Sequence, residues 1–167
     1  MTSILFVCIG NSCRSQMAEG FARSHGAGVV LPASAGLAPI DRIAPETASV
    51  MREKGVDLSD HFTKSFDPVL AASYDLVVNM SGFDLPRVSQ ATVLQWPVAD
   101  PFGSPEEVHR RVRDEIEVGI LRIVDDLRLK KTLTSETIGQ LIAASPSRRL
   151  RLWQMFTGRR GPAKLKD

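Results

Sequence analysis

The chain has 167 residues, 43% of them hydrophobic and 24% charged, proportions that are typical of a globular protein and predict one domain. No apolar run approaches the ~20 residues of a membrane span, and no basic segment precedes the first apolar stretch, so we expect a cytoplasmic protein without a signal peptide. Residues 1–129 contain 12 Lys and Arg against 17 Asp and Glu, whereas residues 130–167 contain 9 against 2, so the basic character belongs to the C-terminal segment.

The first half of the chain predicts alternating strands and helices. Residues 4–7 are uniformly apolar, which is typical of a central parallel strand covered on both faces. Residues 15–25 carry apolar side chains at helical spacing, and residues 29–34 predict a second strand. Residues 45–54 predict a helix with Pro45 near its start and Gly55 after its end. Residues 57–66 are polar and irregular.

The second half continues the alternation. Residues 67–73 predict a short helix, residues 76–78 and 91–96 two further strands, and residues 105–129 the longest helix, with an apolar stripe. Four strands alternating with helices predict an α/β fold with a four-stranded parallel sheet flanked by helices. Ligands in such folds bind beyond the carboxyl ends of the strands, where the loops after the first and fourth strands both open.

The loop between the first strand and the first helix carries the chemistry. A cysteine followed, after five residues, by Arg-Ser at a strand-to-helix junction is the pattern of an oxyanion-binding loop with a nucleophile. Inward-pointing backbone N–H groups and the positive end of the helix would hold a tetrahedral anion. We expect the substrate oxyanion to be bound by Ile9, Gly10, Asn11, Ser12, Cys13 and Arg14.

Each side chain of this loop has an expected part. Cys8 is the nucleophile, with a pKa lowered by the surrounding donors, and Arg14 grips two oxygens of the anion. Ser15 can donate a hydrogen bond to the sulfur, and Asn11 tolerates left-handed dihedral angles. A cysteine beside an apolar strand is more often an inert core residue, but the preceding strand, the Arg-Ser pair and the following helix favour the catalytic interpretation.

Asp100 is the expected general acid. A thiolate that attacks phosphorus expels an oxygen leaving group that needs a proton, and Asp100 lies on the loop that the topology brings to Cys8. No metal or other cofactor is required, because Arg14 and the loop amides would neutralise the oxyanion. His25, His61 and His109 show no metal-ligand spacing, and we interpret them as structural or surface residues.

The basic C-terminal segment, residues 130–167, predicts two helices at residues 134–144 and 148–156. It either packs against the domain of residues 1–129, stays disordered, or contacts an acidic partner, a membrane surface or nucleic acid. Nucleic acid is the weakest of these alternatives, because no aromatic ladder or nucleic-acid-binding motif accompanies the basic residues.

Several motifs together resemble the low-molecular-weight protein-tyrosine phosphatase superfamily over residues 2 to about 128: residues 7–20, 34–36, 55–57, 75–78 and 100–101. The resemblance implies a flavodoxin-like three-layer sandwich. It implies that Cys8 is the nucleophile, Arg14 the phosphate clamp and Ser15 the partner of the thiolate. It also implies that Asn11 organises the loop and that Asp100 is the general acid. The expected reaction is hydrolysis of a phosphotyrosine protein or a small aryl phosphoester through a cysteinyl-phosphate.

The flanking sequences resemble the thioredoxin-coupled arsenate reductases of the same superfamily more closely. Residues 15–20 and 111–116 look like theirs, whereas phosphatases usually have Pro where Gln16 stands and more aromatic residues after Asp-Pro than Phe102 alone. The reductases pass a disulfide along three cysteines, and this chain has none beyond Cys13. Arsenate reduction would therefore need an external thiol or a glutaredoxin-like partner. A non-catalytic phosphate-binding adaptor is the third alternative.

Two further expectations come from the same resemblance and from the loop. In many of the reductases the residues matching Asn11, Glu19 and Ser34 help to hold a potassium ion, and Lys64 stands where their acidic ligand would be. Its ammonium group is then expected to take the place of the cation. Cys13 either forms a reversible, protective disulfide with Cys8 or is a small apolar contact beneath the loop.

Overall fold

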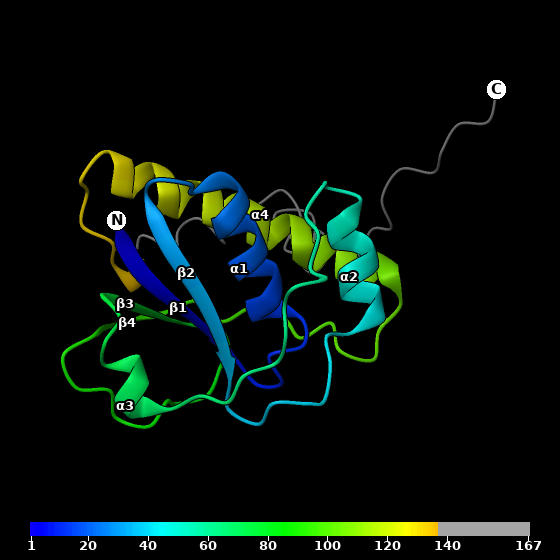
Figure 1. Ribbon diagram of the computed structural model, residues 1–167, viewed down its shortest axis with the longest axis horizontal. Coiled ribbons are helices and arrows are strands. Elements are labelled where there is room, and N and C mark those ends of the chain that lie inside the picture. The colour runs from blue at the N-terminus through cyan, green and yellow to red at the C-terminus, as the bar shows by residue number, and fades with distance from the viewer. Residues whose placement is uncertain (137–167) are drawn as a thin grey trace, which may run out of the picture.

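A computed structural model of the chain describes residues 1–136, and within them the predicted strands and helices are present in the predicted order (Figure 1). The elements are β1 (Thr2–Cys8), α1 (Arg14–His25), β2 (Val30–Gly36), α2 (Pro45–Arg52), α3 (Pro68–Ala71), β3 (Leu76–Asn79), β4 (Thr92–Gln95) and α4 (Glu106–Arg128). The helix predicted at residues 134–144 extends beyond the described residues, and the one at residues 148–156 lies wholly outside them. The division of the chain at residue 129 stays a prediction.

The four strands form one parallel sheet in the order β2-β1-β3-β4. β1 is central: Cys8 at its carboxyl end lies opposite Gly36 of β2, and Val7 lies opposite Asn79 of β3. The predicted parallel sheet flanked by helices is therefore confirmed. The carboxyl ends of all four strands meet at one edge, which is where the loops after β1 and β4 emerge.

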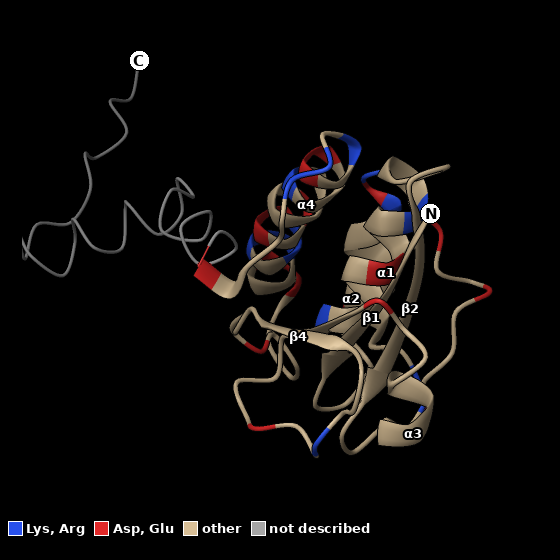
Figure 2. Cartoon of the chain, turned by 90° about the vertical axis from the view of Figure 1, so that its left-hand side faces the viewer, with Lys and Arg blue, Asp and Glu red and all other residues tan. Residues whose placement is uncertain are grey.

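The apolar run of β1 is explained by burial on both faces. Ile4, Phe6 and Cys8 belong to a large core shared with α1 and α4, whereas Leu5 and Val7 belong to a smaller core that includes Ala71 of α3. Alternate side chains of a strand point to opposite faces, so each face receives its own apolar set. Figures 1 and 2 show α1, α2 and α4 on one side of the sheet and α3 on the other.

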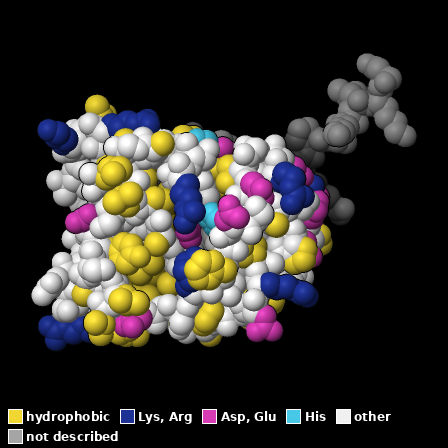
Figure 3. Space-filling view, viewed as in Figure 1, with side chains coloured by type: hydrophobic (Ala, Val, Ile, Leu, Met, Phe, Trp, Pro, Cys, Tyr) yellow, Lys and Arg dark blue, Asp and Glu magenta, His cyan; other side chains and the backbone are white. Residues whose placement is uncertain are grey.

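The two helical layers differ in their surfaces. Lys and Arg alternate with Asp and Glu along α4 (Figure 2), where Arg110 pairs with Glu106 and Arg122 with Asp126, each one helical turn apart. On the face seen in Figure 3, hydrophobic side chains gather over the half of the molecule that holds β2 and α3. The short helix α3 lies in this half, and its Val69 and Leu70 side chains are exposed.

Among the described residues no helix is both long and apolar enough to cross a lipid bilayer.

Gly36 brings β2 close to the loop after β1. A Cβ atom at this position would lie 2.7 Å from the Ile9 carbonyl oxygen and 2.8 Å from the Asn11 nitrogen. The same glycine donates to the Lys64 carbonyl and accepts from the Phe66 N–H, each at 2.8 Å, so the irregular segment 57–66 is tied to the end of β2. Only glycine allows the three segments to pack this closely.

The packing of α4 against Trp96, the residue after β4, depends on a second glycine, which gives a test of the fold. A Cβ atom at Gly119 would overlap the buried ring of Trp96. We expect Gly119→Ala to lower the free energy of unfolding by about 1–3 kcal/mol through overpacking, a loss that outweighs the helix propensity gained. Urea denaturation measures it, with Leu121→Ala on the exposed side of α4 as the control. Equal stability of Gly119→Ala and the parent would contradict this packing.

Candidate active site

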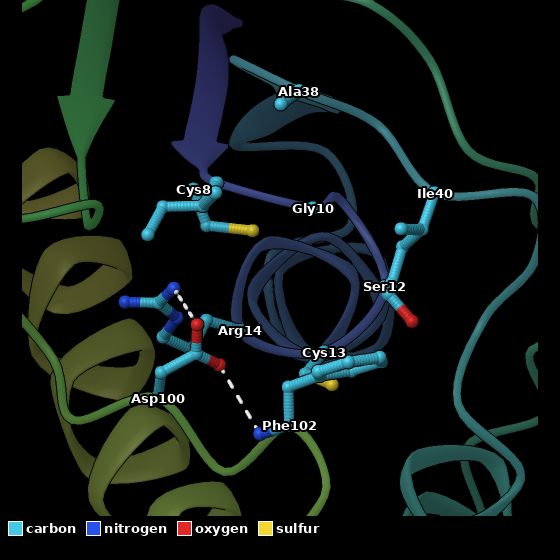
Figure 4. A pocket seen from close by; sticks show the side chains of 10 residues that line it. Cys8, Gly10, Ser12, Cys13, Arg14, Ala38, Ile40, Asp100 and Phe102 are labelled. Atoms are coloured by element: carbon cyan, nitrogen blue, oxygen red, sulfur yellow. Dashed lines mark hydrogen bonds and ion pairs between the residues drawn. The ribbon is translucent and has the colours of Figure 1, made fainter.

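A pocket of about 190 Å³ opens at the carboxyl edge of the sheet (Figure 4). Its floor comes from the loop between β1 and α1, and its walls come from the segment after β2 and the loop after β4. The lining residues are Cys8, Ile9, Gly10, Ser12, Cys13, Arg14, Ala38, Ile40, Asp100 and Phe102. The sheet topology therefore brings together Cys8, Arg14 and Asp100, which the sequence places up to 92 positions apart.

The Cys8 sulfur lies at the end of β1, almost fully buried, 3.0 Å from the Ser15 Oγ. The Asn11 Nδ2 donates to the same Ser15 oxygen at 2.8 Å and to the Ser34 Oγ at 2.9 Å. Asn11 has a φ of 48°, the left-handed conformation expected for it from the sequence. The turn at Asn11 carries the chain from the strand into α1 and leaves the Cys8 side chain facing the pocket, as Figure 4 shows.

Arg14 is held rigidly although its side chain carries a charge and is 3% exposed. Its Nη1 donates to the carbonyl oxygens of Met80 and Val98, at 3.2 and 3.0 Å, and its Nη2 donates to the Asp100 Oδ2 at 2.5 Å. Its Nε is buried and has no hydrogen-bond partner among the described residues. The three bonds hold the guanidinium in place and leave one donor unused, which is costly for a buried group.

Asp100 faces the pocket from the loop after β4 (Figure 4). Its Oδ1 accepts a hydrogen bond from the Phe102 N–H at 3.2 Å, which orients the carboxyl group, and its side chain is 40% exposed. The carboxyl group therefore has contact with both the guanidinium and solvent.

The mouth of the pocket is apolar. Ala38 and Ile40 line one wall, and Phe102, which is 58% exposed, lines another. A wider groove of about 620 Å³ shares Ser12, Ile40 and Phe102 with the pocket. The site is thus a small polar floor below a hydrophobic entrance.

Cys13 lines the pocket as a buried, free thiol, as Cys8 does. Burial raises the pKa of Cys13 to about 11, against a hydrogen bond from Thr47 that lowers it. Cys13 is therefore a thiol near neutral pH. The alternative of a reversible disulfide between the two cysteines stays open.

Two of the expected site residues serve the loop from outside the pocket. The side chains of Asn11 and Ser15 are buried beneath it and bond to each other, while Ile9, Gly10, Ser12 and Cys13 line it. Direct contact of the Asn11 side chain with a ligand in the pocket does not fit this geometry. The Ser12 hydroxyl is also engaged, donating to the Arg42 carbonyl at 2.8 Å.

The Lys64 ammonium group lies where a positive charge was expected from the sequence. It is 3.4 Å from the Glu19 Oε2, and the same carboxylate accepts from Arg23 and from the Ser34 hydroxyl. Glu19 is buried and already neutralised by two cationic side chains, so these residues do not fit a potassium ion. In residues 1–136, no group of three or more His, Cys, Asp and Glu side chains could hold a metal ion.

Two polar side chains behind the loop have partners that the sequence did not predict. Gln16 is fully buried and bonds to Asn11, Phe62 and His61. His109 is also fully buried, with its Nδ1 3.1 Å from the Thr47 Oγ1. A glutamine after Arg-Ser and a histidine within a helix carry no signal by themselves, because their partners lie 45 and 62 residues away.

Comparisons with known proteins agree with this geometry. Residues 3–133 match the family described as low molecular weight phosphotyrosine protein phosphatase. A glutaredoxin arsenate reductase from a Synechocystis species is 37% identical over 128 residues, covering 74% of this chain and 97% of that protein. A structure of an arsenate reductase in the phosphate-binding state superposes with a TM-score of 0.68 at 35% identity and covers 76% of this chain and 99% of that one. An arginine phosphatase from Geobacillus stearothermophilus also gives 0.68, at 28% identity, over 78% of this chain and 95% of that one.

The buried His109 gives a pH dependence of stability. Burial lowers its pKa below the usual value of 6.5, although Glu46, the Pro101 carbonyl and Asp100 oppose the shift. The unfolded chain therefore binds a proton that the folded chain does not, and stability falls as the pH drops below about 6.5.

We expect His109→Gln to flatten this decline by up to about 1.4 kcal/mol per pH unit. Urea denaturation between pH 5 and 8 measures the slope. His61, whose pKa burial also lowers, accounts for part of the remaining slope. An unchanged slope in His109→Gln would contradict the assignment.

Proposed function

The chain belongs to the low molecular weight phosphotyrosine protein phosphatase family, and we propose that it hydrolyses phosphomonoesters of the phosphotyrosine type through a cysteinyl-phosphate. The observation that carries the proposal is the two-part pocket. Cys8, Arg14 and Asp100 surround its floor, and Ala38, Ile40 and Phe102 form an apolar entrance above it. Inorganic arsenate has no organic group to contact such an entrance, whereas an aryl phosphoester has one.

The first step is attack of the Cys8 thiolate on phosphorus. A sulfur–phosphorus bond forms and the bond to the ester oxygen breaks, with the electron pair leaving on that oxygen. Asp100 donates its proton to the leaving oxygen. Arg14 and the backbone N–H groups of the loop hold the remaining phosphoryl oxygens and stabilise the charge in the transition state.

The second step returns the enzyme to its starting state. Asp100, now a carboxylate, removes a proton from water, and the water oxygen attacks phosphorus. The sulfur–phosphorus bond breaks, inorganic phosphate is released and Cys8 is again a thiolate. The Ser15 hydroxyl, 3.0 Å from the sulfur, stabilises the departing thiolate.

Arsenate reduction is the second candidate, because a relative with 37% identity is named a glutaredoxin arsenate reductase. Cys8 would displace hydroxide from arsenate to form a sulfur–arsenic bond. A thiol from glutathione or a similar compound would then attack the Cys8 sulfur, forming a mixed disulfide and releasing arsenite as the arsenic takes up two electrons. A second thiol would reduce that disulfide. An external thiol is required because the chain has two cysteines, both in the loop.

One set of assays separates the candidates. Aryl phosphate hydrolysis, and arsenate reduction with glutathione or mycothiol, are measured for the parent and for Cys8→Ser. We expect the parent to turn over the aryl phosphate and Cys8→Ser to be inactive. Thiol-dependent arsenate reduction without hydrolysis would replace the proposal with the second candidate. Absence of both activities would leave a non-catalytic phosphate-binding adaptor.

Asp100→Asn tests the general acid. We expect hydrolysis of phenyl phosphate, which has a poor leaving group, to slow by roughly 10²-fold or more, because no proton reaches the phenolate. Hydrolysis of dinitrophenyl phosphate should slow much less, since its leaving group needs no proton. Steady-state kinetics on the two esters measures the contrast. An equal effect on both would exclude Asp100 as the acid.

A further inference from the structure

Gln16 lies in the first turn of α1, directly after Ser15, and is fully buried. We propose that Gln16 is a positioning residue for the Cys8 nucleophile: together with the Lys64 backbone N–H it fixes the orientation of the Asn11 amide, which leaves the Ser15 hydroxyl hydrogen to the Cys8 sulfur. The inference rests on the proposed function only in taking Cys8 as the nucleophile.

The orientation of the Gln16 amide is determined by its neighbours. Its Nε2 donates to the Phe62 carbonyl at 2.9 Å and to the Asn11 carbonyl and Oδ1 at 3.0 and 3.2 Å. Its Oε1 lies 2.9 Å from the His61 Nδ1. Because the backbone carbonyls of Phe62 and Asn11 can only accept, the amide nitrogen must face them, so the Gln16 oxygen accepts and the His61 Nδ1 carries the hydrogen.

The Gln16 amide in turn orients the Asn11 amide. The Asn11 Oδ1 accepts from the Gln16 Nε2 and from the Lys64 backbone N–H, the latter at 2.7 Å. A flipped Asn11 amide would place its NH₂ group against both donors. The Asn11 Nδ2 is therefore held toward the Ser15 and Ser34 hydroxyl oxygens.

This series of hydrogen bonds ends at the Cys8 sulfur. The Ser15 Oγ accepts from Asn11, so its own hydrogen is available to the Cys8 Sγ 3.0 Å away. A hydrogen bond to the charged form of a group lowers the pKa of an acid. A chain of hydrogen bonds thus runs from His61 through Gln16, Asn11 and Ser15 to Cys8, and each group donates to the next. The segment that carries His61 therefore influences the hydrogen bond to the Cys8 sulfur without contacting the sulfur itself.

The experiment titrates the Cys8 thiol directly. The rate of iodoacetamide alkylation is measured against pH for the parent and for Gln16→Met, with mass spectrometry assigning the modified cysteine. We expect the midpoint for Cys8 to rise by about one pH unit in Gln16→Met, since a charge-assisted hydrogen bond is weakened. Gln95→Met is the matched control: it removes a glutamine bond to Asn79, outside the loop, and should titrate as the parent does.

A double variant separates positioning from general destabilisation. Ser15→Ala removes the final donor, so adding Gln16→Met to Ser15→Ala should cause no further rise in the midpoint. A merely structural role would lower the melting temperature without moving the midpoint. An unchanged midpoint in Gln16→Met, or additive rises in the double variant, would overturn the inference.

Two features keep this test decisive. If Gln16→Met does not fold, His61→Phe, which keeps Gln16 but removes the donor to its Oε1, decides the matter: a rise in the midpoint supports the inference and an unchanged midpoint overturns it. The titration uses no substrate. A parent that fails to hydrolyse aryl phosphates would therefore refute the proposed function while leaving the thiol measurement intact.

Discussion

The left-handed backbone at Asn11 is the constraint on which the site depends. With a φ of 48°, Asn11 turns the chain from β1 into α1 within a few residues, so that Cys8 and Arg14 face the same pocket. The conformation is sparsely populated for residues with a side chain, and it is stabilised here by hydrogen bonds at every polar atom of the Asn11 amide. Gly36 of β2 leaves the space in which this turn packs.

The sheet topology supplies the second requirement, a fixed guanidinium. Arg14 begins α1, yet its Nη1 is anchored to carbonyl groups just after β3 and β4, at Met80 and Val98. These segments are neighbours only because β3 lies between β1 and β4. The same order places Asp100 against the guanidinium, so the segments after β1, β3 and β4 converge on one side chain. The position of Arg14 is thus a property of the whole sheet and not of the loop alone.

The sequence was sufficient for the fold, and the reasons are local. Some signals come from the spacing of apolar residues, as in β1 and α4, and others mark where a helix begins, as Pro45 does for α2. The elements lie where these signals predict them. The family resemblance, which rests on the loop and the distant Asp-Pro, is confirmed by the match over residues 3–133. The partners of Gln16 and His109 were not predicted, because they lie far away in the sequence and become neighbours only when the chain folds.

Both candidate functions begin with the same chemical event, the attack of a thiolate on a tetrahedral centre. They differ in how the sulfur is then released. A phosphoryl group leaves the sulfur by hydrolysis, for which a carboxyl group and water are enough, and Asp100 is partly open to solvent beside Cys8. An arsenic adduct leaves by taking two electrons, for which a second sulfur is needed. The remaining cysteine, Cys13, is buried with a pKa raised to about 11, so its thiolate is scarce near neutral pH and it is a poor electron donor toward Cys8. The chain therefore contains the groups that the proposed hydrolysis requires, whereas reduction would depend on a thiol from outside.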